Sequence, residues 1–148
     1  MTKLDMPPAW LVLFLAATWG LARLVPALTY EFAWQGTAAL IFFLAALLMM
    51  ALGIVELRSA KTPIQPGAEP TALVTSGIFR RSRNPMYLGV LLVLAAWIIW
   101  VGTILAVPLL WLLYSLISRR FIAGEEIKLR EAFGQEFDDW ADQTGRWL

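Results

Sequence analysis

Three arginines lie within four positions near the middle of the chain, at Arg80, Arg81 and Arg83. The dipeptide Asn84-Pro85 follows and leads the chain into an apolar run. Guanidinium groups bind anions through charge-assisted hydrogen bonds, so this strip could hold a negatively charged ligand. Arg80 and Arg81 could equally bind anionic lipid headgroups. Arg83 differs from them because Asn84-Pro85 fixes it at the start of the apolar segment.

Two adjacent carboxylates, Glu125 and Glu126, form a second polar element. Glu126 belongs to a stripe whose members recur every three or four positions, which predicts an amphipathic helix: Ile122, Glu126, Leu129, Phe133, Phe137 and Trp140. A carboxylate on a buried helix face needs a partner, and it could bind ribose hydroxyls or an ammonium group. Ordinary surface charge is the alternative for this pair.

Tyr87 and Gly89 lie just after the arginine strip. The tyrosine offers a ring for stacking and a hydroxyl for hydrogen bonding, and the glycine lets a backbone or a flat ligand approach closely. Together with the carboxylate pair, these residues predict a cytoplasm-facing pocket that has cationic and hydroxyl-binding groups on opposite walls.

The chain contains no cysteine and no histidine. Disulfides and thiolate ligands are therefore excluded, and the usual metal ligand and the usual general base near neutral pH are missing. We predict no metal site and no nucleic-acid partner.

Long apolar runs decide the fold class, because 59% of the 148 residues are hydrophobic. We expect an all-α integral membrane protein, a single membrane domain over residues 1–148. About four transmembrane helices are expected, two spans followed by a helical hairpin, at residues 9–28, 34–55, 86–100 and 103–118. The first run is longer than the apolar core of a signal peptide, so we interpret it as a span. The hairpin should turn at Val101-Gly102, with Pro108 kinking its return helix.

Charge patterning predicts the orientation in the membrane. Residues 58–83 form a proline-rich loop, and residues 119–148 form an amphipathic segment that should break at Gly134. Nearly all lysines and arginines lie on the side of these two segments, and none lies in the loops opposite. By the positive-inside rule the loop, the amphipathic segment and both termini are cytoplasmic. We expect the membrane to be the bacterial inner membrane.

Two motifs resemble those of a known superfamily. Residues 83–89, Arg-Asn-Pro-Met-Tyr-Leu-Gly, resemble the R-[HN]-P-x-Y-x-G signature of integral membrane methyltransferases. These include isoprenylcysteine carboxyl methyltransferases and phosphatidylethanolamine N-methyltransferases. Residues 125–134 resemble the family's E-E-x-x-L-x-x-x-F-G, and residues 77–80 resemble its G-[LI]-[YF]-R lead-in. Arg146 falls where the family has a C-terminal arginine.

The resemblance implies S-adenosylmethionine as the cofactor and methyl transfer to a lipophilic small molecule or lipidated substrate among membrane lipids. It also implies a cofactor cradle built from the loop before Gly77, the Arg83–Gly89 turn and the two glutamates. The cofactor-binding residues are then Gly77, Arg83, Asn84, Pro85, Tyr87, Leu88, Gly89, Glu125 and Glu126. Glu126 and Arg146 are the candidate catalytic residues, with Arg146 positioning an acceptor carboxylate. The oligomeric state is not predicted.

Three departures from the family pattern bear on the acceptor. Asn84 replaces the commoner histidine and brings the motif closer to the phospholipid enzymes. Phe137 and Trp140 stand where the family usually has tyrosine, so a hydroxyl role is lost there. The proline that often follows the C-terminal arginine is missing.

The missing histidine favours one acceptor chemistry. A carboxylate is already ionised at pH 7 and needs no base, whereas an ammonium must first lose a proton. We therefore favour an activity like that of isoprenylcysteine carboxyl O-methyltransferases. Phospholipid N-methylation remains an alternative, with a Glu or Tyr as the base. A membrane reductase that binds the NADPH 2′-phosphate through the three arginines is another, and a non-catalytic module that binds anionic lipid is a third.

Overall fold

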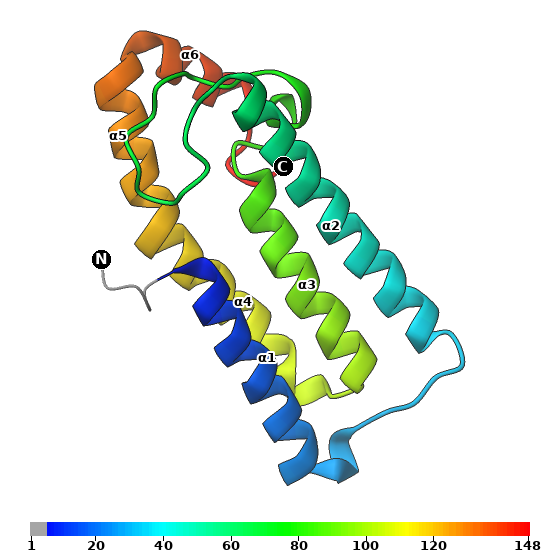
Figure 1. Ribbon diagram of the computed structural model, residues 1–148. Helices are drawn as coiled ribbons and strands as arrows, with labels where there is room; N and C mark the ends of the chain where they lie inside the picture. Colours follow the sequence, from blue (N-terminus) through cyan, green and yellow to red (C-terminus); the bar gives the residue numbers. More distant parts are fainter. Residues whose placement is uncertain (1–5) are drawn as a thin grey trace.

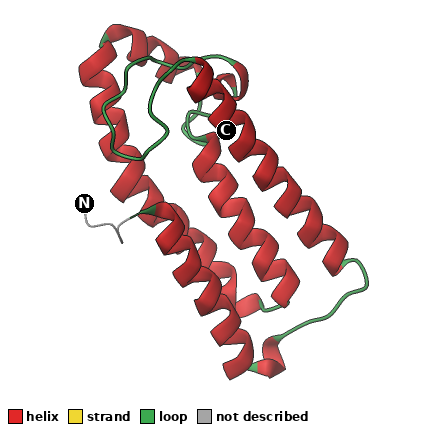
Figure 2. Cartoon of the chain, in the orientation of Figure 1, coloured by secondary structure: helices red, strands yellow, loops and turns green. Residues whose placement is uncertain are grey.

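Four apolar helices run side by side and form the membrane part of the protein (Figures 1 and 2). The computed structural model describes residues 6–148, and the four helices are α1 (Pro7–Leu24), α2 (Gln35–Ser59), α3 (Pro85–Val101) and α4 (Val107–Ile117). Three of them carry proline in their first turn, where the missing N–H costs no helical hydrogen bond.

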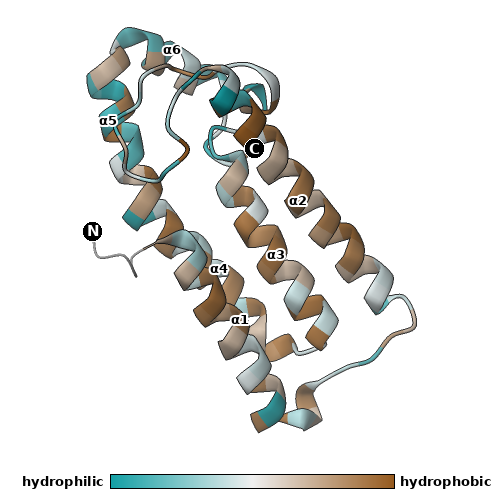
Figure 3. Ribbon diagram, in the orientation of Figure 1, coloured by the Kyte–Doolittle hydropathy of each residue, from teal (hydrophilic) through white to brown (hydrophobic). Residues whose placement is uncertain are grey.

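Three helical segments are long and apolar enough to cross a membrane: α1, α2 and the continuous segment Ile104–Phe133. Helix α3 is a shorter apolar helix of 17 residues, or about 26 Å. Figure 3 shows hydrophobic residues along all four helices. No strand occurs in the described part of the chain. The predicted all-α membrane fold is confirmed.

The hairpin between α3 and α4 turns at Gly102, as the sequence predicts. Gly102 is left-handed, with φ of 70°, and a Cβ there would overlap the carbonyl oxygen of Tyr30. The Tyr30 backbone N–H donates to the Gly102 carbonyl oxygen at 2.7 Å, and Gln35 Nε2 donates to the Trp100 carbonyl oxygen at 2.9 Å. The α1–α2 connection is therefore tied to the hairpin turn.

The predicted kink at Pro108 is wrong. A short 3-10 turn, Ile104–Ala106, precedes α4, and Pro108 lies in the first turn of that helix. At this position proline removes no helical hydrogen bond and clashes with no preceding turn, so it starts the helix and does not bend it.

The return helix does not stop where the apolar run gives way to polar residues. A π turn, Ser118–Ile122, joins α4 to α5 (Ala123–Phe133) without a break. Gly134, with φ of 53°, then separates α5 from α6 (Gln135–Gln143), as expected. Single π turns inside α-helices often lie at functional sites.

Polar elements gather at one end of the helix bundle. The loop between α2 and α3, helices α5 and α6, and the C-terminus lie at this end, and the start of α1 faces the same way (Figure 1). Their hydrophilic colour contrasts with the bundle in Figure 3. The α1–α2 connection and the hairpin turn lie at the other end.

Small residues let α2 and α3 approach closely. A Cβ on Gly89 would lie 2.7 Å from Cγ of Met50 and 3.0 Å from the carbonyl oxygen of Ala46, both on α2. A Cβ on Gly53 would lie 2.9 Å from Cγ of Met86. Glycines at such crossings are common between membrane helices because they permit backbone contact.

This packing predicts that Gly89→Ala destabilises the protein. The backbone of Ala46 cannot move aside as a side chain can, so the two helices must separate, at a cost of roughly 1–3 kcal/mol. Gly20→Ala on α1 is the matched control, because no atom lies within 4 Å of its Cβ position. Thermal unfolding in detergent should show a melting temperature lowered by several degrees for Gly89→Ala alone. Equal changes in the two variants would contradict the close approach.

Candidate functional site

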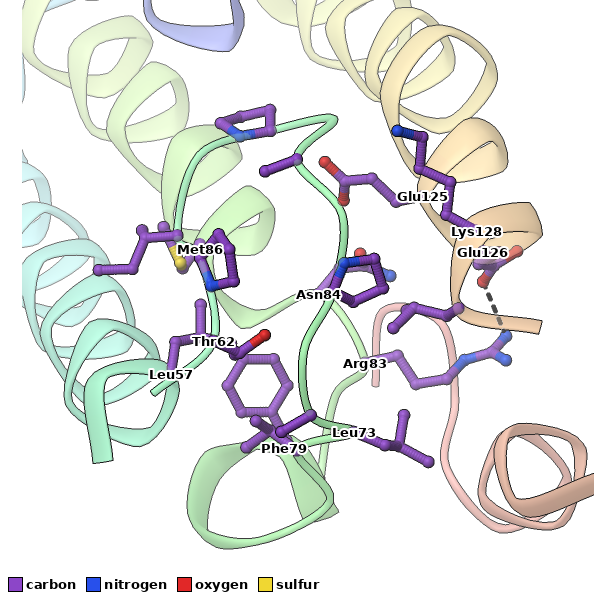
Figure 4. A pocket seen from close by; sticks show the side chains of 18 of the residues that line it. Leu57, Thr62, Leu73, Phe79, Arg83, Asn84, Met86, Glu125, Glu126 and Lys128 are labelled. Atoms are coloured by element: carbon purple, nitrogen blue, oxygen red, sulfur yellow. Dashed lines mark ion pairs between the residues drawn. The ribbon is translucent and has the colours of Figure 1, made fainter. Parts of the chain in front are cut away.

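A cavity of about 170 Å³ lies at the polar end of the bundle (Figure 4). Its walls come from the α2–α3 loop, the start of α3, helix α5 and helix α6. We call residues 62–74 the cavity loop, because this part of the α2–α3 loop supplies most of one wall. Apolar and aromatic groups line the cavity together with two carboxylates and two cations: Leu57, Phe79, Met86, Leu129, Phe137, Trp140, Arg83, Glu125, Glu126 and Lys128.

Hydrogen bonds hold the cavity loop at its base and at its tip. At the base, the Thr71 backbone N–H donates to Thr62 Oγ1 at 3.1 Å. At the tip, Lys128 Nζ donates to the Gly67 carbonyl oxygen at 2.7 Å and pairs with Glu69 Oε1 at 2.7 Å. The Gly67 N–H also donates to the Glu125 carboxylate. Side chains of helix α5 therefore hold the tip of the cavity loop over the cavity by hydrogen bonds.

Glu125 joins α5 to α3. The hydroxyl of Tyr87 donates to Glu125 Oε1 at 2.6 Å, and the Tyr87 side chain is buried. Phe121, in the π turn, packs beside the same ring with centroids 6.4 Å apart. The carboxylate is thus satisfied on one side by a phenol and on the other by the cavity loop.

Glu126 lies between two arginines. Arg83 Nη2 lies 3.2 Å from Glu126 Oε1, and both side chains are only 14% exposed. Arg146 Nε donates to Oε1 at 3.0 Å, and Arg146 Nη2 forms a short ion pair with Oε2. The hydrogen bonds to Glu126 raise the pKa of Arg146, so this guanidinium stays charged. Two cations surround one carboxylate, which leaves an excess positive charge.

The backbone of the last residues completes this arrangement. The Arg83 N–H donates to the Gly145 carbonyl oxygen at 3.0 Å, and Asn84 Nδ2 donates to the Arg146 carbonyl oxygen at 2.9 Å. The turn before α3 therefore fixes a segment about sixty residues away in the sequence. As a result Arg146 has a defined position.

Aromatic rings form the wall at α6. The Arg83 guanidinium lies 5.9 Å, and the Arg130 guanidinium 5.3 Å, from the ring centroid of the buried Phe137. Trp140 Nε1 donates to the Phe79 carbonyl oxygen at 3.3 Å. In these two positions, where the superfamily usually has tyrosine, the chain supplies ring faces and an indole N–H.

The structure brings six of the predicted site residues to the cavity wall: Arg83, Asn84, Pro85, Tyr87, Glu125 and Glu126. Leu88 and Gly89 do not line the cavity, and Gly89 packs against α2. Gly77, with φ of 54°, also lies outside it, and a Cβ there would overlap the Glu56 carboxylate. Arg146 contacts Glu126 without lining the cavity.

The loop before Gly77, which the resemblance assigns to the cradle, does line the cavity, but sequence reasoning missed Lys128. Lys128 lies three positions after Glu125 on α5, a spacing that places two side chains on neighbouring parts of a helix surface. That spacing is a signal that could have suggested Lys128. Arg80 and Arg81 are exposed and do not line the cavity, which agrees with the lipid-headgroup interpretation for them.

Comparison with known proteins places these features in a family. A model described as phospholipid methyltransferase matches residues 34–136. The chain belongs to the phospholipid methyltransferase family. It is therefore a membrane methyltransferase, and the family membership favours methyl transfer over the reductase and over a non-catalytic module. The matched range contains the Arg83–Gly89 turn and both glutamates, and it ends before Arg146.

One relative matches part of the chain in sequence. An uncharacterized protein of Haemophilus influenzae is 40% identical over 67 residues, which cover 43% of this chain and all of that protein. No solved structure matches this phospholipid methyltransferase family member.

The hydrogen bonds of Lys128 to the cavity loop predict that Lys128→Met increases the local opening of residues 65–70. The variant removes the charged donor that holds the Gly67 carbonyl, which should increase local opening about tenfold. Hydrogen exchange read by mass spectrometry would measure this, with the exposed Arg119→Met as control. If both variants exchange like the unchanged protein, Lys128 does not hold the loop.

Proposed function

We propose that the protein uses S-adenosylmethionine to methylate a carboxylate on a lipophilic acceptor, in the manner of isoprenylcysteine carboxyl methyltransferases. The observation that carries this proposal is the position of Glu126. On one side its partner Arg83 lines the cavity, and on the other its partner Arg146 lies outside the cavity. One carboxylate thus separates a cavity suited to a cofactor from a cation suited to an acceptor.

The donor set of the cavity fits S-adenosylmethionine. Rings and apolar side chains suit the adenine, and the two carboxylates suit the ribose hydroxyls and the ammonium group. Arg83 suits the carboxylate of the cofactor, and its buried Nε has no hydrogen-bond partner among the described residues. When bound, the cofactor supplies a methyl group on a positively charged sulfur.

The volume of the cavity indicates how the loop takes part. Sites for ligands of drug size usually have about 300–1,000 Å³, and this cavity has about 170 Å³. The cavity loop must therefore shift outward to admit the cofactor. The loop then excludes water from the ligand beneath it, while Glu125 and Lys128 provide the contacts that hold it.

Arg146 is the residue assigned to the acceptor. Its side chain is 44% exposed, although two of its nitrogens contact Glu126. A planar guanidinium suits two-point recognition of a carboxylate. An acceptor carboxylate is ionised at neutral pH, so no residue has to remove a proton, which agrees with a chain that lacks histidine.

Phospholipid N-methylation is the second candidate, and two observations favour it. The matching family is described as phospholipid methyltransferase. The hydrogen-bonded pair of Tyr87 and Glu125 also offers a buried carboxylate that could accept the proton of an ammonium group. Methyl transfer from labelled cofactor into farnesylcysteine or into phosphatidylethanolamine distinguishes the two acceptors.

We further propose that the polar end faces the cytoplasm, in a bacterial inner membrane. The arginine strip directly precedes α3, Arg119 and Arg120 lie in the π turn that leads into α5, and Lys128 lies on α5. Among the described residues, the opposite loops contain no lysine or arginine. By the positive-inside rule this asymmetry supports a cytoplasmic polar end, which is the side on which the cofactor is available.

Glu126→Gln should weaken cofactor binding more than Arg81→Gln. The first variant removes the charge that balances Arg83 and Arg146, whereas Arg81 is exposed away from the cavity. Loss of a charged hydrogen bond costs roughly 1.5–3 kcal/mol, or about one to two decades in Kd. Calorimetry in detergent measures both variants. Undetectable binding of the cofactor and of its demethylated product to the unchanged protein would overturn the proposed function.

Arg146→Lys should raise the acceptor KM and lower turnover, with cofactor Kd nearly unchanged. A lysine keeps the charge but cannot bind a carboxylate at two points. Arg119→Lys, at an exposed position of the π turn after α4, is the control. Steady-state kinetics with farnesylcysteine in mixed micelles measures the effect. A loss confined to cofactor affinity would place Arg146 on the cofactor side instead.

A further inference from the structure

A second polar region lies on the face of Glu126 that is turned away from the cavity. Tyr114, on α4, packs its ring against the indole of Trp147 with centroids 4.9 Å apart. The backbone N–H of Ser118 donates to the Tyr114 carbonyl oxygen, so these two residues lie one helical turn apart on the same face. Trp147 directly follows Arg146, and the guanidinium of Arg146 interacts electrostatically with the nearby Tyr114. We call Tyr114, Ser118, Arg146 and Trp147 the headgroup niche.

Two buried donors in this niche have no acceptor. Trp147 Nε1 and Ser118 Oγ are both buried, and neither has a hydrogen-bond partner among the described residues. Indole nitrogens usually find an acceptor when they are buried, and Trp97 Nε1 does so by donating to the Leu15 carbonyl oxygen at 3.0 Å. One orphaned donor lies in the π turn and the other in the C-terminal segment beside Arg146, and buried donors without an acceptor next to a cation indicate a ligand that carries oxygen atoms.

The niche is reachable from outside the protein. Tyr114 is 40% exposed and Arg146 is 44% exposed, whereas the two orphaned donors lie deeper. The ring of Trp147 also packs against the apolar core cluster that α3 and α4 share. The niche therefore offers hydrogen-bond donors and a positive charge beside an apolar surface, at the boundary where a lipid headgroup meets its chain.

We propose that the headgroup niche binds the anionic oxygen atoms of the acceptor lipid, with Trp147 Nε1 and Ser118 Oγ as donors. Both groups need an oxygen acceptor, and the excess positive charge at Glu126 calls for an anion. A carboxylate or a phosphate ester joined to an apolar chain has both features. The inference rests on the proposed function and adds two specificity-determining residues to it.

The test uses Trp147→Phe, which removes the N–H and keeps a ring against Tyr114. Its matched control is Trp111→Phe, because Trp111 is exposed on α4, the helix that carries Tyr114, and lies outside the niche. Ser118→Ala, at the start of the π turn, and Ser115→Ala, on α4, form a second pair. The first measurement is the rise in melting temperature that farnesylcysteine causes in the full-length protein without cofactor. Phosphatidylethanolamine is the second probe, and farnesol, which has no anion, is the third.

The expected result separates the variants by probe. Trp147→Phe should lose most of the rise caused by one of the anionic probes, Ser118→Ala should lose part of it, and both controls should keep it. A loss seen with farnesylcysteine identifies a carboxylate as the natural anion, and a loss seen with phosphatidylethanolamine identifies a phosphate. Farnesol should change the melting temperature of all variants equally. Kinetics should show an acceptor KM about three- to tenfold higher for Trp147→Phe, with cofactor Kd unchanged.

Stability without ligand distinguishes binding from a structural role in the serine pair. Ser118→Ala removes an unpaired buried hydroxyl with almost no change in shape, so it should not melt earlier than Ser115→Ala. Trp147→Phe also loses packing against the core, so its acceptor-induced rise is measured from its own melting temperature without ligand. Equal acceptor-induced rises in Trp147→Phe and Trp111→Phe would overturn the niche, and so would a lower basal melting temperature in Ser118→Ala than in Ser115→Ala. A protein that shows the expected rises but transfers no methyl group would overturn the proposed function and leave the niche standing.

Discussion

The ion pairs of Glu126 with Arg83 and Arg146 are the contacts on which the rest of the site depends. A carboxylate that is only 14% exposed needs partners, and removing one of them would leave a charge poorly compensated. Here the partners come from the turn before α3 and from the C-terminal segment, while Glu126 belongs to α5. One carboxylate therefore joins three parts of the chain that the bundle alone would not bring together.

The adjacency of Glu125 and Glu126 has a geometric reason. Successive residues of a helix point about 100° apart, so neighbouring carboxylates cannot share one partner. Glu125 reaches Tyr87 on α3 and the tip of the cavity loop, whereas Glu126 reaches the two arginines. The π turn at Ser118–Ile122 lies directly before α5, so it shifts the helical register of both glutamates relative to α4.

The local features of this fold could be predicted from sequence, because short-range chemistry determines them. Apolar runs predict the membrane helices, and Gly102 and Gly134 mark the positions where helices end. The charged segments predict which end of the bundle is polar. That Arg83 and the two glutamates line one cavity was also within reach. Pro108 shows the limit of this reasoning, since a proline kinks a helix or begins it according to where the first turn falls.

Long-range contacts were out of reach for a different reason. The cavity loop has no hydrophobic period, so the sequence does not show that its tip bonds to Lys128 and Glu125. The sequence allowed either a ligand or another backbone to approach Gly89, and the structure shows that α2 packs against it. Partners separated by many residues leave no periodic trace in a single sequence, so such contacts need the structure.

The two sides of Glu126 also suit the two solvents that a membrane methyltransferase must serve. The cavity lies under a polar loop held by charged side chains of α5, so a polar cofactor can arrive from water. The far side faces Tyr114 and Trp147, whose rings are typical of the membrane interface. In the proposed function, a lipid acceptor would keep its chain among apolar helices there while its headgroup meets Arg146. Because the guanidinium is tied to Glu126, such a headgroup would find a cation whose position is already fixed, and its binding would lose less conformational entropy.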